Sequence, residues 1–184
     1  AGYSHSCGID VDGGVHCWGI DGGYDDYGQV SDTPIGTFIQ VSAGYFHSCA
    51  IDSNGSVQCW GDDGFGQSSP PSGTFVQIAA GYLHTCGIDS SGSVQCWGWD
   101  LHDQVSDAPS GNFVEISAGN DHSCGLDPSG DVQCWGRDDG QMTDAPSGDF
   151  VQVSAGNSHS CALDASGTVH CWGSDYHGKS TPPS

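Results

Sequence analysis

Ten cysteines are the residues with the clearest chemical potential, because they form five pairs with nine residues between the two members of each pair. Thiols at a fixed spacing either bind a metal ion or join as disulfides. The segment between Cys49 and Cys59 alternates apolar and polar residues with the period of two that is typical of strands. Asn54 and Gly55 lie at its midpoint, where glycine suits the left-handed position of a short hairpin loop. The pattern predicts a β-hairpin.

Folding the chain about Asn54 places Cys49 opposite Cys59, at a cross-strand distance that a disulfide spans. A zinc site is the alternative, since a histidine such as His47 lies two residues before each first cysteine. Structural zinc sites use four ligands and usually show C-x-x-C spacing, whereas each repeat offers three ligands without that spacing. We therefore predict five disulfides, each within one hairpin: Cys7–Cys17, Cys49–Cys59, Cys86–Cys96, Cys124–Cys134 and Cys161–Cys171.

Acidic loops follow the tryptophan-glycine pairs that end the hairpins. They are candidate calcium sites, because carboxylate oxygens are the ligands that Ca²⁺ prefers. Calcium is the one cofactor that the sequence suggests. The candidate ligands are Asp21, Asp62, Asp63, Asp100, Asp138, Asp139 and Asp175.

Three aromatic residues outside the repeated pattern are candidate contacts for a sugar or a protein partner. Tyr24 and Tyr27 flank two aspartates in the long loop of the first repeat, and Trp99 follows the third hairpin. Tyrosine and tryptophan suit such contacts because each combines an apolar ring with a hydrogen-bonding group. An ordinary loop insertion is the alternative for the first-repeat loop. Asn54 begins the sequon Asn-Gly-Ser at a hairpin tip and is the candidate glycosylation site.

The first cysteines of the pairs recur every 37 to 42 residues, which indicates a single repeat array. The predicted fold is all-β, a β-propeller-like array of five disulfide-linked hairpins, with ring closure left open. Four connecting strands are expected at Phe38, Phe75, Phe113 and Phe150, whereas a closed ring would need a fifth. We expect one repeat domain over 1–184, with repeats at residues 1–42, 43–79, 80–117, 118–154 and 155–184.

Composition and charge exclude some classes of partner. Leu, Ile, Val and Phe total 31 of 184 residues and the formal net charge is -21, a combination that would suggest disorder if the repeats did not overrule it. Arg137 and Lys179 are the only Lys or Arg residues, so nucleic acid and anionic membranes are poor partners. No apolar run approaches the length of a membrane span, so membrane insertion is not expected.

Disulfides at this density indicate an oxidising compartment. We therefore expect a secreted or cell-surface protein, and the lack of a visible signal peptide fits a mature chain that starts at Ala1.

Histidines and tryptophans recur once per repeat, which favours structural roles because an active site is usually made once. We expect each imidazole to bond the backbone at the Ala-Gly turn and each indole to pack one blade against the next. The chain has no nucleophile elbow, phosphate loop or H-E-x-x-H motif, so we predict a non-enzymatic protein. The repeated residues are His5, His47, His84, His122 and His159, and Trp18, Trp60, Trp97, Trp135 and Trp172.

The repeated pattern V-S-A-G-x-x-H-S-C-A-x-D-x-x-G-x-V-x-C-W-G-x-D-x-x-G-Q resembles the regulator-of-chromosome-condensation repeat, in a short disulfide-bearing form similar to exported bacterial proteins. The resemblance covers essentially the whole chain. It implies a β-propeller with one repeat per blade that serves as a rigid binding platform. Family members include a nuclear exchange factor and a secreted inhibitor of β-lactamases. The exchange-factor role is not expected here, because export and the missing basic surface contradict it.

The sequence thus favours a non-enzymatic, exported scaffold that binds partners or assembles with copies of itself. The first repeat begins at Ala-Gly without a preceding strand and the fifth ends without a following one, so we expect uncapped ends that associate head to tail into a fibre. A lectin-like carbohydrate-binding module that uses the loops after the tryptophans is one alternative, and an inhibitor of an extracellular enzyme is another. The expected partners are accordingly copies of the chain, glycans or an extracellular protein.

Overall fold

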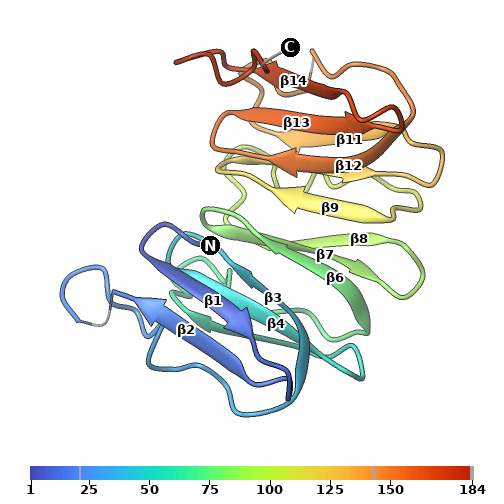
Figure 1. Cartoon of the computed structure of the whole chain (residues 1–184). Coiled ribbons are helices and arrows are strands. Elements are labelled where there is room, and N and C mark those ends of the chain that lie inside the picture. The colour runs from blue at the N-terminus through green and yellow to red at the C-terminus, as the bar shows by residue number, and fades with distance from the viewer. Residues whose placement is uncertain (21, 143, 183–184) are drawn as a thin grey trace.

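A computed structural model describes residues 1–20, 22–142 and 144–182, and these residues form strands, turns and loops without a helix (Figure 1). Strands form where apolar and polar residues alternate, and the intervening Gly, Ser, Asp and Pro residues form the turns. The strands are β1 (His5–Ile9), β2 (Val15–Gly19), β3 (Phe38–Ala43), β4 (His47–Asp52), β5 (Val57–Gly61), β6 (Phe75–Ala80), β7 (His84–Asp89), β8 (Val94–Gly98), β9 (Glu115–Ala118), β10 (His122–Leu126), β11 (Val132–Gly136), β12 (Phe150–Ala155), β13 (His159–Asp164) and β14 (Val169–Gly173).

The strands form five antiparallel sheets, one around each predicted hairpin. The first sheet contains only β1 and β2, and the other four have the orders β3-β4-β5, β6-β7-β8, β11-β10-β9 and β12-β13-β14. In each three-stranded sheet the first strand comes from the end of one predicted repeat and the hairpin from the next. The predicted connecting strands are confirmed, except that β9 starts at Glu115 instead of Phe113.

The hairpin register agrees with the prediction. Ile51 faces Val57 and Cys49 faces Cys59, and Gly55 at the loop has a left-handed φ of 84°. All ten cysteines form the five predicted disulfides, with Cα–Cα distances of 4.0 to 4.1 Å. Asp52 closes the loop, because its Oδ1 accepts hydrogen bonds from the backbone N–H groups of Asn54 and Ser56 at 2.8 and 2.9 Å.

Each sheet has two different faces. The disulfide face carries the cystine and aliphatic residues such as Ile51 and Val57, and the tryptophan face carries the residue that follows the second cysteine. The disulfide face of one sheet packs on the tryptophan face of the next, so that Cys49 and Ile51 share a buried cluster with Phe75 and Trp97. Four such clusters form the core, one between each pair of consecutive sheets. The predicted packing of the tryptophans between blades is therefore confirmed for these four interfaces.

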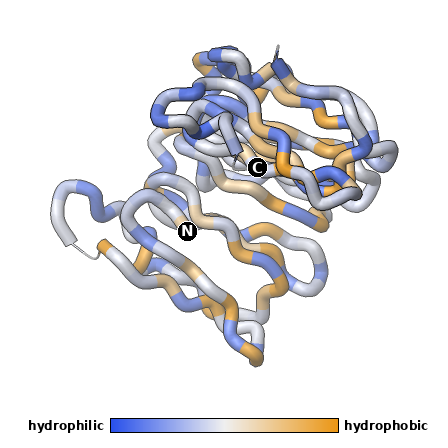
Figure 2. The backbone as a smooth tube through the Cα atoms, turned by 45° about the horizontal axis from the view of Figure 1, so that its top comes forward, coloured by the Kyte–Doolittle hydropathy of each residue, from blue (hydrophilic) through white to orange (hydrophobic). Residues whose placement is uncertain are grey.

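The sheets follow one another in an arc, with the first and the last sheet at its two ends (Figures 1 and 2). Across the described part of the chain, no strand pairing joins β1–β2 to β12–β14. The array is propeller-like and is not closed into a ring in this structure.

We expect Phe75→Ala to lower the free energy of unfolding by about 3–5 kcal/mol, because it opens a cavity between the second and third sheets. Phe75 is 1% exposed, whereas Val76, the next residue on the same strand, is 59% exposed. Val76→Ala is therefore the matched control and should change the free energy by less than about 0.5 kcal/mol. Denaturant unfolding of both variants under non-reducing conditions measures the difference. Equal effects of the two substitutions would contradict the assignment of this core.

Candidate functional site

Each buried tryptophan is held by a main-chain carbonyl of the preceding repeat. The carbonyl belongs to a glutamine whose own side chain is buried and whose Oε1 accepts a backbone hydrogen bond, as from Phe65 to Gln67 at 2.9 Å. The acidic loop therefore presents this carbonyl in a fixed direction toward the indole Nε1–H. The bonds are Trp60–Gln29 (3.0 Å), Trp97–Gln67 (3.0 Å), Trp135–Gln104 (3.1 Å) and Trp172–Gln141 (2.7 Å).

Each buried histidine bonds a hydroxyl group of the following sheet. The hydroxyl of Thr85 donates to the carbonyl of Gln67 at 3.1 Å, so the Nε2–H of His47 is the donor to Thr85. The prediction that the imidazole bonds the backbone of the Ala-Gly turn is therefore wrong, because the ring reaches the neighbouring sheet instead. The four bonds are His5–Ser48 (2.7 Å), His47–Thr85 (2.8 Å), His84–Ser123 (2.8 Å) and His122–Ser160 (2.9 Å).

The Ala-Gly turns join the sheets along the inner side of the arc. The backbone N–H after the glycine donates to the glycine carbonyl of the next repeat, as from Tyr45 to Gly81 at 3.1 Å and from Tyr82 to Gly119 at 3.2 Å. Glycine is required because a Cβ at Gly44 would lie 2.5 Å from the Gly81 oxygen. These bonds fix the turns of successive repeats against one another.

The first and the last sheet each expose one face that is covered in the sheets between them. The first sheet exposes its tryptophan face, and the last sheet exposes its disulfide face. On the first sheet Trp18 is 58% exposed, whereas Trp97 between two sheets is 7% exposed. On the disulfide face of the last sheet, Val169 is 45% exposed, and a hollow of about 260 Å³ is lined in part by Cys161 and Leu163. We name these surfaces the Trp18 face and the Val169 face.

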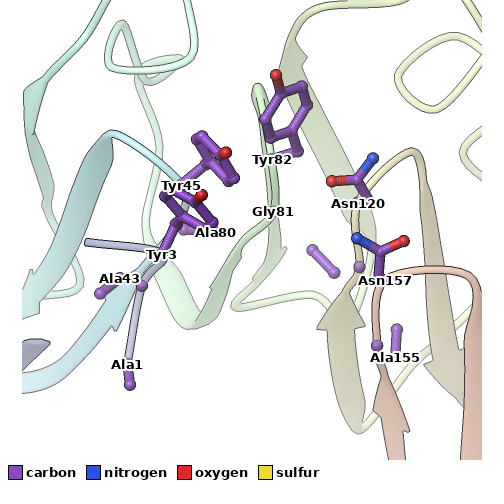
Figure 3. A pocket seen from close by; sticks show the side chains of 15 residues that line it. Ala1, Tyr3, Ala43, Tyr45, Ala80, Gly81, Tyr82, Asn120, Ala155 and Asn157 are labelled. Carbon is purple, nitrogen blue, oxygen red and sulfur yellow. The ribbon is translucent and has the colours of Figure 1, made fainter. Parts of the chain in front are cut away.

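A second hollow, of about 370 Å³, lies where the five Ala-Gly turns converge, and we call it the axial hollow (Figure 3). The side chain that follows the glycine of each Ala-Gly turn determines the chemistry of the hollow. Three repeats supply tyrosines and two supply asparagines, and the two kinds of side chain lie on different sides of the hollow (Figure 3). These residues are Tyr3, Tyr45, Tyr82, Asn120 and Asn157.

The tyrosines of the axial hollow form a connected aromatic group. Tyr3 stacks on Tyr45 with ring centroids 4.0 Å apart, and Tyr82 meets Tyr45 edge to face at 4.4 Å. Phe46 continues the group, because it contacts Tyr45 at 4.4 Å and Tyr27 at 5.1 Å. Desolvation and a hydrogen bond with Tyr3 raise the pKa of Tyr45 to about 12, so its phenol remains protonated at neutral pH.

The structure separates the three aromatic residues that were predicted as ligand contacts. Tyr27 joins the aromatic group of the axial hollow through Phe46. Tyr24 projects fully into solvent, and Trp99 packs against Phe65 and His102 in another part of the surface. A ligand role for these three residues stays a prediction. Glycosylation of Asn54 also stays a prediction, and the residue lies at the exposed hairpin tip where it was expected.

The acidic loops use their carboxylates as hydrogen-bond acceptors within the loop. Asp62 accepts from the backbone of Gly64 at 3.1 Å and from the side chain of Gln67 at 2.8 Å. The other candidates also have partners: Asp63 (Ser68 and Ser69), Asp100 (Val105 and Ser106), Asp138 (Gly140 and Met142), Asp139 (Arg137) and Asp175 (Ser180 and Thr181).

Calcium binding by these loops stays a prediction. Among the residues that the structure describes, no three His, Cys, Asp or Glu side chains gather into a group that could hold a metal ion. Asp21, the remaining candidate ligand, lies outside the described residues.

The residues that line the axial hollow were not predicted from the sequence. The signal was the variable position directly after each recurring Ala-Gly, where the repeats carry either tyrosine or asparagine. The buried glutamines that hold the tryptophans were not predicted either, although Gly-Gln recurs after three of the hairpins and Asp103-Gln104 follows the third hairpin. Both sets act between repeats, so their importance depends on how consecutive sheets are placed.

A family model described as the regulator of chromosome condensation (RCC1) repeat matches residues 38–67, 75–104, 113–141 and 150–179. No curated protein matches the chain in a sequence search. The described part of the chain includes no helix with the length and apolar character of a membrane span.

Solved structures share the fold. The ectodomain of the receptor kinase CR4 from Physcomitrella patens has a TM-score of 0.81 at 28% identity over 98% of this chain and 52% of that one. The ectodomain of the receptor kinase ACR4 from Arabidopsis thaliana has a TM-score of 0.76 at 31% identity over 99% and 64%. Prp20p from Saccharomyces cerevisiae has a TM-score of 0.75 at 20% identity over 94% and 56%, which shows the fold alone. The chain thus spans between half and two thirds of each of these proteins.

We expect the free energy of unfolding to fall as the pH drops from about 6.5 toward 4.5, because three histidines are buried in their neutral form. Burial lowers the pKa of His47 and His84 to about 3 and that of His122 to about 4. In the unfolded chain they titrate near about 6.5, so below that pH the unfolded state takes up protons that the folded state excludes. Above about pH 6.5 the three histidines cost no stability. The free energy of unfolding falls as the pH drops from that value toward the pKa values of the folded state.

Denaturant unfolding at a series of pH values and constant ionic strength measures this loss, which should reach about 1.4 kcal/mol per histidine near pH 5.5. His84→Gln should reduce the slope of the unfolding free energy against pH by the amount that corresponds to about one bound proton. Replacement of the exposed His177 by Asn is the control and should leave the slope unchanged. A flat profile between about pH 6.5 and 4.5 would contradict neutral burial of the imidazoles.

Proposed function

Because the chain belongs to the regulator of chromosome condensation (RCC1) repeat family, whose propeller-like fold it shares, we propose that it is a non-enzymatic, exported scaffold that associates head to tail with copies of itself. Five disulfides and the similarity to two receptor ectodomains support an extracellular location. The observation that carries the association is the complementarity of the Trp18 face and the Val169 face.

The two faces carry opposite halves of an interface that occurs four times within the chain. Inside the array, a tryptophan face always covers a disulfide face. Trp18 is an uncovered tryptophan, and Cys161, Leu163 and Val169 belong to an uncovered disulfide face. Large aromatic residues that enter an apolar recess are typical energetic centres of protein interfaces. A copy placed in the position of the next sheet would bring Trp18 onto the Val169 face.

Polar groups on the two faces are complementary as well. His159 occupies the position of the histidines that bond the following sheet, and Ser6 occupies the position of their hydroxyl partners. The backbone N–H of Asn157 corresponds to the groups that donate to a glycine carbonyl, and Gly2 supplies a carbonyl at the matching position. A head-to-tail contact would therefore pair His159 with Ser6 and Asn157 with Gly2 of the second copy.

Such a contact joins different surfaces of the two copies, so it is heterologous and can be repeated at each new end. The large negative charge opposes lateral contact between the resulting filaments and keeps them apart at low ionic strength. Unlike enzymatic function, this role requires only rigid sheets and two matching ends.

We expect the native protein to form elongated particles whose length rises with concentration. Trp18→Ala and Val169→Asp should each abolish growth, because each removes one half of the contact. Mixing the two variants should restore pairing but stop at dimers, since each variant keeps one intact face. Sedimentation velocity and negative-stain electron microscopy measure both effects.

Substitutions away from the ends provide the controls for this experiment. Phe65→Ala removes an exposed aromatic residue and Val76→Asp adds a charge at an exposed valine, and both should assemble like the native protein. A native protein that stays monomeric at every concentration would overturn the proposal. Association that survives in both end variants, or that the mixture does not restore, would show a different contact.

A further inference from the structure

The axial hollow has a composition that differs from the rest of the surface. The protein carries 23 acidic residues, yet the side chains that line this hollow are alanine, tyrosine and asparagine, with glycine between them. No charged side chain lines the hollow, so it offers no ion-pair partner that would offset the desolvation of a charged ligand. The chemistry of the hollow therefore selects an uncharged ligand.

The aromatic side of the hollow offers ring faces and phenol groups. Tyr82 stands nearly perpendicular to Tyr45, with an interplanar angle of 81°, so the two rings form a corner. Tyr3 supports Tyr45 by stacking at an interplanar angle of 15°. The C–H faces of a sugar ring pack against such aromatic faces, while the phenol groups remain available for hydrogen bonds.

Asn120 and Asn157 lie next to each other on the other side of the hollow (Figure 3). Asn120 Nδ2 donates one hydrogen bond to Asp121 Oδ2 at 3.0 Å, and Asn157 Oδ1 accepts one from Ser158 Oγ at 2.8 Å. A second N–H and a second lone pair remain on these atoms, together with Asn120 Oδ1 and Asn157 Nδ2, and this gives the donors and acceptors that hydroxyl groups require. The backbone of Asn120 is fixed, since its N–H donates to the Gly156 carbonyl at 3.3 Å. Aromatic rings and amides are thus held at a constant separation by the Ala-Gly turns.

We propose that the axial hollow is a binding site for a neutral sugar, such as one or two pyranose units of a glycan. Its volume of about 370 Å³ lies at the small end of the range for ligand pockets, about 300–1,000 Å³. Tyr45 and Tyr82 provide the stacking corner, and Asn120 and Asn157 provide the hydrogen bonds that orient the hydroxyl groups. The site differs from the post-tryptophan loops, because none of those loops lines the hollow. The Tyr45–Tyr82 corner lies away from the Trp18 and Val169 faces, whereas Gly2 and Asn157 line the hollow and also belong to the proposed head-to-tail contact. Sugar binding is therefore also measured on the Trp18→Ala variant, which cannot form that contact.

The test is a titration of the native protein with neutral monosaccharides and disaccharides of glucose, galactose, mannose and N-acetylglucosamine, followed by saturation-transfer NMR and calorimetry. We expect at least one of these sugars to bind with millimolar or better affinity. Tyr82→Ala and Asn120→Ala should each weaken that binding about tenfold or more, which corresponds to a loss of about 1.4 kcal/mol. Unfolding curves of both variants check that the fold is kept.

Two controls separate the axial hollow from other aromatic surfaces. Tyr24→Ala removes a fully exposed tyrosine and should leave binding unchanged. Trp99→Ala removes the aromatic residue after the third hairpin, and a loss of binding in this variant alone would place the site in the post-tryptophan loops. No binding of any sugar in the panel, or equal binding by the native protein and both axial variants, would overturn the proposal. The result does not depend on filament formation, because Trp18→Ala should bind the same sugar as a monomer.

Discussion

The structure depends on the packing of a tryptophan face on the disulfide face of the preceding sheet. Each sheet is small, and the chain has few aliphatic residues, so a single sheet buries too little apolar surface to be stable alone. A disulfide stabilises each hairpin by about 3 kcal/mol through the unfolded state. The large indole then fills much of the space between sheets, together with a phenylalanine and two isoleucines in clusters such as that of Trp97.

Hydrogen bonds between the sheets fix the relative orientation of the packed sheets. The indole N–H, the imidazole and the backbone of the Ala-Gly turn each find a partner on a neighbouring repeat. Unpaired buried polar groups are costly, so these three bonds favour one placement of each sheet over nearby alternatives. The consequence for function is a rigid inner rim, on which the side chains of Tyr45, Tyr82 and Asn120 are held at fixed positions.

The same repeated interface connects the two proposed activities. Head-to-tail association extends the sequence of tryptophan faces on disulfide faces beyond one chain, through Trp18 and Val169. Sugar binding uses the side of the repeats where the glycines bring successive turns close together. The first activity depends mainly on the faces of the outer sheets and the second on the inner rim, and Gly2 and Asn157 belong to both.

The sequence by itself determined the hairpins, their register and the disulfides, because these features depend on contacts between residues about ten positions apart in the chain. It also predicted that the repeated tryptophans lie between blades, since the period of two places them on the face opposite the cysteines, and this holds for four of the five but not for Trp18. Only the tertiary structure decided that His47 meets Thr85, that Trp97 meets Gln67 and that five Ala-Gly turns form one hollow. These contacts join residues about 30 to 38 positions apart, and they depend on the rotation and spacing of whole sheets. That placement results from the packing of many side chains together, and no local pattern encodes it.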